Sequence, residues 1–131
     1  AVKIGLLKHK ASSYEPHFKD CIIFPMKDRS GHIVDLYGRN INDKGHYYLP
    51  GNHQGLYPCY PKADTTKLIL TEAIIDAATL LQYTDFNMLA CYGTNGFTQE
   101  HEQAIKELQQ LEEVIFFFGG IGSAAHVIFV S

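Results

Sequence analysis

The sequence has no long apolar segment. A membrane-spanning helix needs about 20 consecutive apolar residues, and no fully apolar run here is longer than that from Val114 to Phe118. No basic-then-apolar leader opens the chain either, so we expect no membrane partner, no export and a cytoplasmic location. A short apolar run of this kind is typical of a buried strand in a globular domain.

Cysteine is scarce as well, and the spacing of a zinc site is missing. Cys21, Cys59 and Cys91 are odd in number, widely spaced and lack a Cys-x-x-Cys pair, which argues against a disulfide framework and against zinc in this segment. We expect reduced thiols of a cytosolic protein. His46 and His53 are the nearest histidine pair, but no third ligand lies close to them in the sequence. They are therefore expected to be polar loop residues rather than metal ligands.

What the chain does have is an uneven division of charge. Residues 1–67 contain ten Lys and Arg against six Asp and Glu, whereas residues 68–131 contain one Lys against eight Asp and Glu. A basic lobe beside an acidic lobe suits a protein that holds a polyanion on one side and a divalent cation on the other. Uneven solvation of two surfaces explains the same numbers, so charge alone leaves both interpretations open.

The first half is predicted to be rich in β-strand. Residues 21–26 and 32–38 are apolar, β-branched runs on either side of a turn, Asp28-Arg29-Ser30-Gly31, and this pattern favours an antiparallel hairpin. Residues 46–49 predict a third strand. The segment 51–66, with its prolines and glycines, is the expected connector between two units, residues 1–62 and residues 63–131.

The second half alternates predicted strands and helices. Apolar strands are expected at 67–71, 87–92 and 113–118, with one helix at 73–81 and another from its N-cap Thr98 to about residue 111. Apolar strands joined by helices indicate a parallel sheet with right-handed crossovers. The predicted fold is therefore α/β, a parallel sheet flanked by helices and preceded by a small, mainly antiparallel α+β unit.

Two carboxylates stand where such a sheet binds ligands. Glu72 directly follows the first strand of the second half, at the edge where ligands of parallel sheets sit. Asp76 lies one helical turn later, on the same face. Together they could hold a divalent cation or act on a proton; the alternative is that they only complement the dipole of the helix. After the second strand, Gly93-Thr94-Asn95-Gly96 would let the backbone approach a phosphate.

Taken in order, several segments resemble one protein family. FPMKDRSGHIVDLYGR, HYYLP, LYPCY, LILTEAIIDAATLL, ACYGTNG and VIFFFGG follow the order and spacing of bacterial-type DNA primases over residues 19–122. The first part is similar to the RNA-polymerase basic subdomain of the catalytic core, and the part from Lys67 is similar to its toprim domain. The resemblance implies a DNA primase-type nucleotidyltransferase, which makes short RNA primers on single-stranded DNA from nucleoside triphosphates with Mg²⁺ or Mn²⁺. It also implies a replicative helicase as a partner of full-length relatives.

The resemblance assigns roles to particular residues. Glu72 falls on the toprim glutamate, a catalytic and metal-binding position, and Asp76 falls on the following acid of that helix, a weaker metal ligand. Gly93 and Thr94 fall on the Gly-Thr turn after the second strand, and Arg39 falls on the arginine of a Gly-Arg pair in the basic subdomain. We expect these last three residues to contact nucleic acid or nucleotide.

The basic unit carries the other expected contacts to single-stranded DNA. The candidate phosphate contacts are Lys27, Arg29, Arg39 and Lys44. The candidate stacking partners for bases are Tyr37, Tyr47 and Tyr48. Cross-strand packing is the alternative role of the tyrosines.

One departure from the family pattern bears on activity. Where the family continues its third toprim strand with Asp-x-Asp, this sequence has Gly119 and Ile121. Two-metal phosphoryl chemistry needs several carboxylates to hold both ions. We therefore expect weak binding of Mg²⁺ or Mn²⁺ and impaired primer synthesis. The family pattern also predicts that the toprim-like unit is C-terminally truncated.

Three functions stay open at this point. The chain is a primase core impaired by the loss of Asp-x-Asp, or a non-catalytic nucleic-acid-binding remnant of a mobile-element primase. The third candidate is a dinucleotide-binding domain, because residues 120–125 imitate a glycine-rich fingerprint. That site also needs an acidic residue about 20 positions later, which the sequence does not supply.

Overall fold

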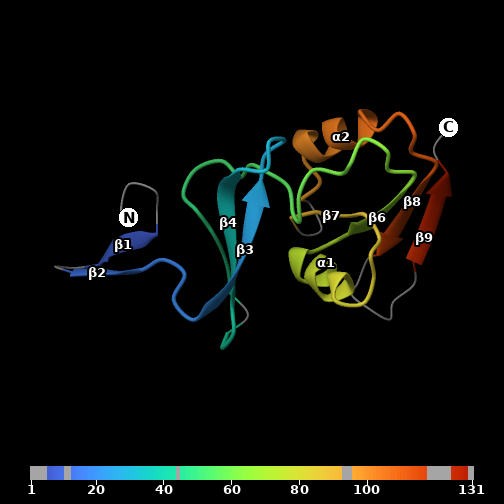
Figure 1. Ribbon diagram of the computed structural model, residues 1–131. Helices are drawn as coiled ribbons and strands as arrows, with labels where there is room; N and C mark the ends of the chain where they lie inside the picture. The colour runs from blue at the N-terminus through green and yellow to red at the C-terminus, as the bar shows by residue number, and fades with distance from the viewer. Residues whose placement is uncertain (1–5, 11–12, 44, 93–95, 118–124, 130–131) are drawn as a thin grey trace.

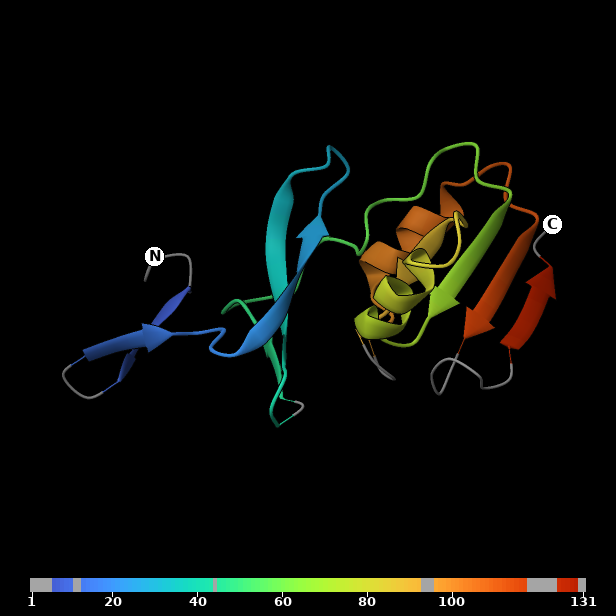
Figure 2. The same ribbon diagram turned by 60° about the horizontal axis from the view of Figure 1, so that its bottom comes forward.

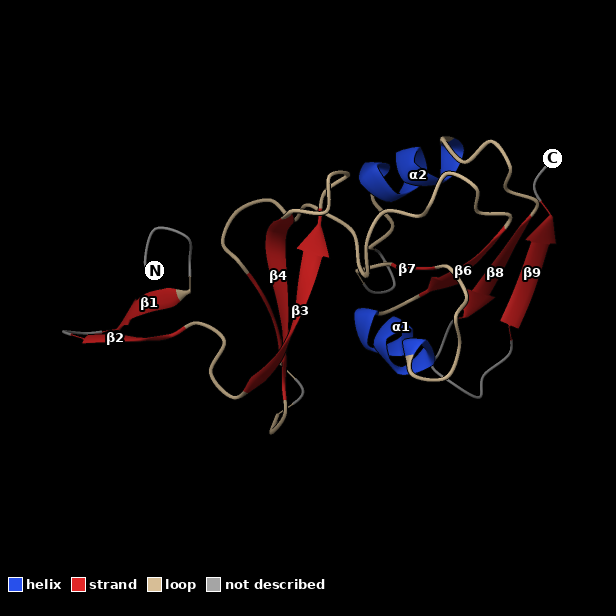
Figure 3. Ribbon diagram, viewed as in Figure 1, coloured by secondary structure: helices blue, strands red, loops and turns tan. Residues whose placement is uncertain are grey.

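Three β-sheets and two helices make up the described part of the chain (Figures 1 and 3). The computed structural model describes residues 6–10, 13–43, 45–92, 96–117 and 125–129. A two-stranded ribbon of β1 (Leu7–Lys10) and β2 (Ser13–Pro16) lies at the end of the molecule farthest from both helices, as Figures 1 and 2 show. No helix among the described residues is long and apolar enough to cross a membrane.

An antiparallel sheet of three strands follows the ribbon. Its strands are β3 (Cys21–Lys27), β4 (Ile33–Asn40) and β5 (His46–Tyr48), in that spatial order. The turn between β3 and β4 is closed by the Asp28 carboxylate, which accepts hydrogen bonds of 2.9 Å from the backbone N–H groups of Ser30 and His32. Gly31 takes a positive φ of 84° there, a conformation that glycine adopts without strain. The predicted hairpin and third strand are confirmed.

The second unit is a four-stranded sheet with two crossover helices. In chain order its elements are β6 (Lys67–Thr71), α1 (Ile74–Leu81), β7 (Met88–Ala90), α2 (Gln99–Lys106), β8 (Glu113–Phe117) and β9 (Ala125–Phe129). The strand order is β7-β6-β8-β9, and β6 pairs in parallel with both β7 and β8. The predicted α/β class and its parallel core are thereby confirmed.

The two helices cover opposite faces of this sheet, with α2 above it and α1 below it in Figure 1. The alternation of side chains along β6 explains the arrangement, since successive residues of a strand point to opposite faces. Leu68 and Leu70 pack in one cluster with Ala104 of α2, whereas Ile69 packs in the other cluster with Ile74 of α1. Leu68, Ile69 and Leu70 are all nearly inaccessible to solvent.

The antiparallel sheet packs against the α1 side of the second unit. Phe24, Met26 and Tyr37 share one buried cluster with Ile74 and Ala77 of α1. The connector contributes to the core as well, because isolated bridges pair Lys27 with Leu56 and Tyr57 with Ala90. This continuous burial determines which ends of the hairpin meet which helix.

Two elements differ from the sequence-based expectation. Helix α2 ends at Lys106 rather than near residue 111. The apolar periodicity runs on because the following turns, with i→i−3 hydrogen bonds from Leu108 to Ile105 and from Leu111 to Leu108, still bury both leucines. The unexpected strand β9 pairs antiparallel with β8 and forms the edge of the sheet.

Candidate functional site

The candidate site lies at the carboxyl end of β6, where Glu72 leaves the sheet. The backbone N–H of Glu72 donates a 3.1 Å hydrogen bond to the carbonyl oxygen of Phe117, the last residue of β8. Helix α1 begins two residues later, and Asp76 lies in its first turn. The N-cap, Ala73, makes no side-chain hydrogen bond to the helix, so the two acids supply the negative charge at this helix N-terminus.

Glu72 and Asp76 act on each other electrostatically, and Arg39 acts on the same place. Burial raises the pKa of the Asp76 carboxyl, and the charge of Glu72 raises it further. A backbone hydrogen bond at Ala73 and the positive charge of Arg39 on β4 oppose that rise. The charge of Arg39, on β4, and the charge of Glu72, which follows β6, therefore both act on the Asp76 carboxyl of α1.

Arg39 is also tied to its own sheet. Burial raises the pKa of the Tyr37 hydroxyl, while a hydrogen bond with Arg39 and the charge of Arg39 oppose the rise. The Tyr37 hydroxyl and His46 Nδ1 form a short hydrogen bond on the neighbouring strand. Tyr37 is only 3% exposed, so its ring packs in the core, which was the alternative expected for it.

Cys91 follows β7, and the charge of Glu72 acts on its thiol. Burial, with the Glu72 charge adding to it, raises the pKa of the Cys91 thiol to about 11. The thiol is therefore neutral at physiological pH, and only a thiolate binds metal well. Among the described residues at this end of the sheet, Glu72 and Asp76 offer carboxylate oxygens as donors for a cation.

The donor set for a metal is small. Within the described ranges, no group of three or more His, Cys, Asp and Glu side chains is arranged to hold a metal ion. The predicted contacts Gly93, Thr94 and Lys44, and the positions Gly119 and Ile121 where the family has its aspartates, lie outside the described residues. Two carboxylates fit one cation that keeps most of its water.

Lys27 and Arg29 lie at the other end of the β3–β4 hairpin, beside α2. The two terminal guanidinium nitrogens of Arg29, Nη1 and Nη2, donate to the carboxylate of Glu107, Nη2 over 2.8 Å. The same guanidinium stands 4.8 Å from the centroid of the Tyr60 ring. Lys27 is half-buried, and its backbone N–H donates to Leu56 across the isolated bridge. These two residues and Arg39 therefore lie at opposite ends of one hairpin.

A pocket beside β5 and the connector was not predicted from the sequence. A pocket of about 490 Å³ is lined by Tyr48, Asn52, His53, Tyr92, Gly96 and Thr98. Its rings come from β5, the connector and the residues after β7. Tyr48 was expected as a stacking residue, but nothing in the spacing of the sequence points to Tyr92 or His53 as its neighbours.

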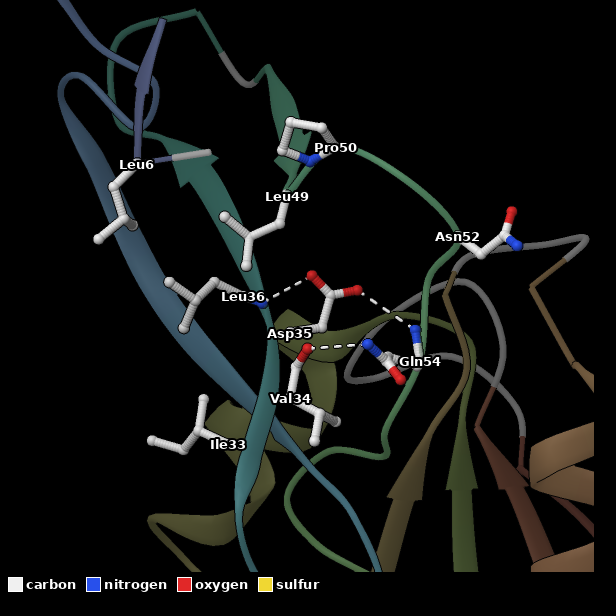
Figure 4. A pocket seen from close by; sticks show the side chains of 9 residues that line it. All are labelled: Leu6, Ile33, Val34, Asp35, Leu36, Leu49, Pro50, Asn52 and Gln54. Atoms are coloured by element: carbon white, nitrogen blue, oxygen red, sulfur yellow. Dashed lines mark hydrogen bonds between the residues drawn. The ribbon is translucent and has the colours of Figure 1, made fainter. Parts of the chain in front are cut away.

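Another pocket, of about 440 Å³, lies beside β4 (Figure 4). Among the described residues that line it, Asp35 is the only charged one, and this residue is 3% exposed. It accepts hydrogen bonds from the backbone N–H groups of Leu36 at 2.8 Å and Gln54 at 3.2 Å, which Figure 4 draws as dashed lines. Because these bonds already satisfy the carboxylate, its role here is to hold the connector against β4.

The comparisons with known proteins agree with this architecture. No family model matches the sequence. The chain is 32% identical to the DNA primase of Buchnera aphidicola over 99 residues, which cover 67% of this chain and 17% of the relative. It is 29% identical to the DNA primase of Pseudomonas putida over 132 residues, which cover 91% of this chain and 20% of the relative. A solved DnaG primase catalytic domain bound to single-stranded DNA has a similar fold, with a TM-score of 0.69 and 19% identity over 93% of this chain and 52% of that domain.

These similarities extend along most of this chain but along only part of each relative. The chain spans about a fifth of the length of the curated relatives and about half of the solved catalytic domain. An antiparallel sheet beside a parallel sheet with helices is the shared architecture. The chain belongs to the family of bacterial-type DNA primases and corresponds to part of their catalytic core.

Proposed function

We propose that the chain is a primase-type core segment that binds nucleoside triphosphate and single-stranded DNA, with Arg39, Glu72 and Asp76 forming the ligand site. The observation that carries this proposal is that Glu72 and Arg39, from different sheets, both act on the Asp76 carboxyl. A triphosphate between them would meet a guanidinium for its phosphates and carboxylates for its cation.

The carboxylate pair supports a cation at this site. Burial and the charge of Glu72 both disfavour the ionised form of Asp76, and a divalent cation removes that repulsion. Glu72 and Asp76 would hold the Mg²⁺ or Mn²⁺, which when bound neutralises phosphate charge. Arg39 supplies phosphate binding from the opposite sheet, and the neutral Cys91 thiol contributes no charge.

The same donor set leads us to propose that the chain by itself does not make primers. Gly119 and Ile121 carry no carboxylate, so two acids remain to hold metal where two-metal chemistry uses several. Binding of single-stranded DNA does not depend on these metal-binding carboxylates. The solved DnaG catalytic domain of the same fold is bound to single-stranded DNA, and we propose that Arg39 contacts phosphate here, with Lys27 and Lys44 as further contacts.

A calorimetric titration with Mg²⁺ and Mn²⁺ tests the cation site. We expect weak binding to the original chain, no measurable binding to Glu72→Gln, and tighter binding to the double variant Gly119→Asp, Ile121→Asp. Glu112→Gln is the matched control. This exposed acid directly precedes β8, at the end of the sheet opposite the candidate site, and its change removes the same charge. Equal binding by the original chain and Glu72→Gln would show that the cation is held elsewhere.

A template-dependent primer assay completes the test. The original chain is expected to give no product, whereas it should bind single-stranded DNA in a salt-dependent way. Primer synthesis by the unmodified chain would overturn the proposed impairment. DNA binding with no cation binding in any variant would favour the non-catalytic nucleic-acid-binding remnant instead.

A further inference from the structure

The pocket lined by Tyr48, Asn52, His53, Tyr92, Gly96 and Thr98 is called here the aromatic pocket. The rings of Tyr48 and His53 lie 4.0 Å apart between centroids at an angle of 37°. Tyr92 meets both edge-on, 5.7 Å from Tyr48 at 67° and 5.9 Å from His53 at 76°. Ring faces and ring edges therefore meet around one hollow, and flat aromatic groups prefer such offset and edge-to-face contacts.

The walls of the aromatic pocket are held firmly. The Tyr92 hydroxyl donates a short hydrogen bond to the carbonyl oxygen of Gly55, and the Gly55 N–H donates to the Glu100 carboxylate at 2.9 Å. His53 Nδ1 lies 3.9 Å from the buried Asp35 carboxylate. Gly55 has a positive φ of 82°, and a Cβ there would come within 2.8 Å of the Val34 side chain. The connector is thus fastened in a shape that leaves the rings in place without a ligand.

The chemistry of the lining suits a flat ring with polar edges. Burial is the main cause that raises the pKa of both Tyr48 and Tyr92, so both rings stay neutral phenols at physiological pH. Asn52 adds an amide, and the His53 side chain is 44% exposed, so its ring reaches solvent. The volume of about 490 Å³ falls within the range of roughly 300–1,000 Å³ typical of small-molecule sites.

The aromatic pocket also neighbours the carboxylate site. Tyr92 directly follows Cys91, and the charge of Glu72 raises the pKa of the Cys91 thiol. The backbone N–H of Cys91 donates a 2.9 Å hydrogen bond to Thr71, the residue before Glu72. The pocket and the carboxylates therefore lie at the carboxyl ends of adjacent strands, β7 and β6, which is where ligands of parallel sheets bind.

We propose that the aromatic pocket holds a nucleobase, stacked on the exposed ring of His53 and bordered by the rings of Tyr48 and Tyr92. The inference rests on the proposed function, which it extends by assigning base recognition to residues separate from the phosphate and cation contacts. A base in this pocket comes either from a free nucleoside triphosphate or from a DNA strand. Stacking on an aromatic side chain tolerates every base, so we expect weak discrimination between bases.

Calorimetry with four probes tests this pocket: ATP, inorganic tripolyphosphate, a short single-stranded oligonucleotide, and the same oligonucleotide with abasic sites. The variants are His53→Ala, Tyr48→Leu and Tyr92→Phe. The matched control is Tyr83→Leu, because the Tyr83 ring is 78% exposed and lines none of the pockets described above. His53→Ala keeps the test usable if Tyr48→Leu fails to fold, since His53 lies at the surface.

If a free nucleotide fills the aromatic pocket, His53→Ala and Tyr48→Leu lower the affinity for ATP about tenfold and leave the affinity for tripolyphosphate unchanged. If a DNA strand fills the pocket, the same variants lower the affinity for the oligonucleotide but not the affinity for its abasic form. Tyr92→Phe keeps the ring and has a smaller effect in either case. The inference is overturned if His53→Ala and Tyr48→Leu bind all four probes as Tyr83→Leu does. Failure of every probe to bind the original chain would refute the proposed function and this inference together.

Discussion

The two ends of the β3–β4 hairpin carry an arginine each, and the two arginines have different partners. At the turn end, Arg29 is paired with Glu107 and stands over the Tyr60 ring. At the other end, the charges of Arg39 and Glu72 act in opposite directions on the pKa of the Asp76 carboxyl. The sequence analysis named both arginines as candidate phosphate contacts. The comparison teaches that a carboxylate supplied by the second unit makes Arg29 a link between the two units, whereas binding a ligand is a role proposed for Arg39.

The largest effect on stability should come from removing a core side chain that holds both ends of the β3–β4 hairpin against the second unit. Met26 is fully buried between the antiparallel sheet and α1. Met26→Ala is expected to lower the free energy of unfolding by about 3 kcal/mol, because transfer and cavity terms add. Urea unfolding measures this, with Ile33→Ala as the control, since that side chain is 60% exposed and should cost at most about 0.5 kcal/mol. A loss below about 1 kcal/mol for Met26→Ala would mean that the two units do not depend on this contact.

The next effect concerns pH and helix α2, the partner of the turn end. His101 is fully buried, accepts from the Thr98 N–H at Nδ1 over 3.1 Å, and contacts the Ala90 carbonyl oxygen through Nε2 at 2.8 Å. Burial lowers the pKa of His101 below its ordinary 6.5, against the Ala90 hydrogen bond and the charge of Glu100. The unfolded chain therefore binds more protons than the folded chain as pH falls through 6.5. Stability present above that pH is lost below it, by at most about 1.4 kcal/mol per pH unit.

Urea unfolding between pH 7.5 and pH 5.5 checks the histidine prediction. His101→Gln should remove much of the pH dependence in this window. His32→Gln serves as the control, because the His32 side chain in the hairpin turn is 78% exposed. If His101→Gln retains the full pH dependence of the original chain, another group is responsible for it.

A smaller effect is expected on single-stranded DNA binding from the end that holds Arg39. Arg39→Ala should weaken binding and reduce the slope of log affinity against log salt by about 0.7, the change for one phosphate contact on a single strand. Lys67→Ala is the matched control, because it removes one positive charge at the opposite end of β6. An unchanged affinity and slope in Arg39→Ala would remove this residue from the proposed site.

The smallest effect should come from the turn end. Arg29→Ala is expected to lower the urea midpoint slightly and in a salt-dependent manner, because exposed ion pairs are screened by salt. It should leave the DNA salt slope unchanged, in contrast to Arg39→Ala. A double-mutant cycle with Glu107→Gln separates the pair from other effects. A slope change as large as that of Arg39→Ala would mean that Arg29 leaves Glu107 to bind phosphate.

The elements of the fold that depend on local patterns could be predicted from the sequence. The apolar run of β6, the capping of α2 by Thr98 and the turn at Asp28 each use neighbouring residues, and the structure has all three. The end of α2 could not be predicted, because buried leucines continue the helical period beyond Lys106. The reciprocal partner of Thr98 in the capping box is His101, which the sequence analysis did not predict.

For the candidate site, the sequence by itself determined that Glu72 and Asp76 follow a buried strand and share the start of one helix, because these are properties of neighbouring positions. Only the tertiary structure decided that the charge of Arg39 acts on Asp76 and that Arg29 joins Glu107, 78 positions away along the chain. It also decided that Tyr48, His53 and Tyr92 surround one pocket. The physical reason is that periodicity and turn chemistry act over a few residues, whereas these partners meet only after Met26, Ile74 and their neighbours have packed into a common core.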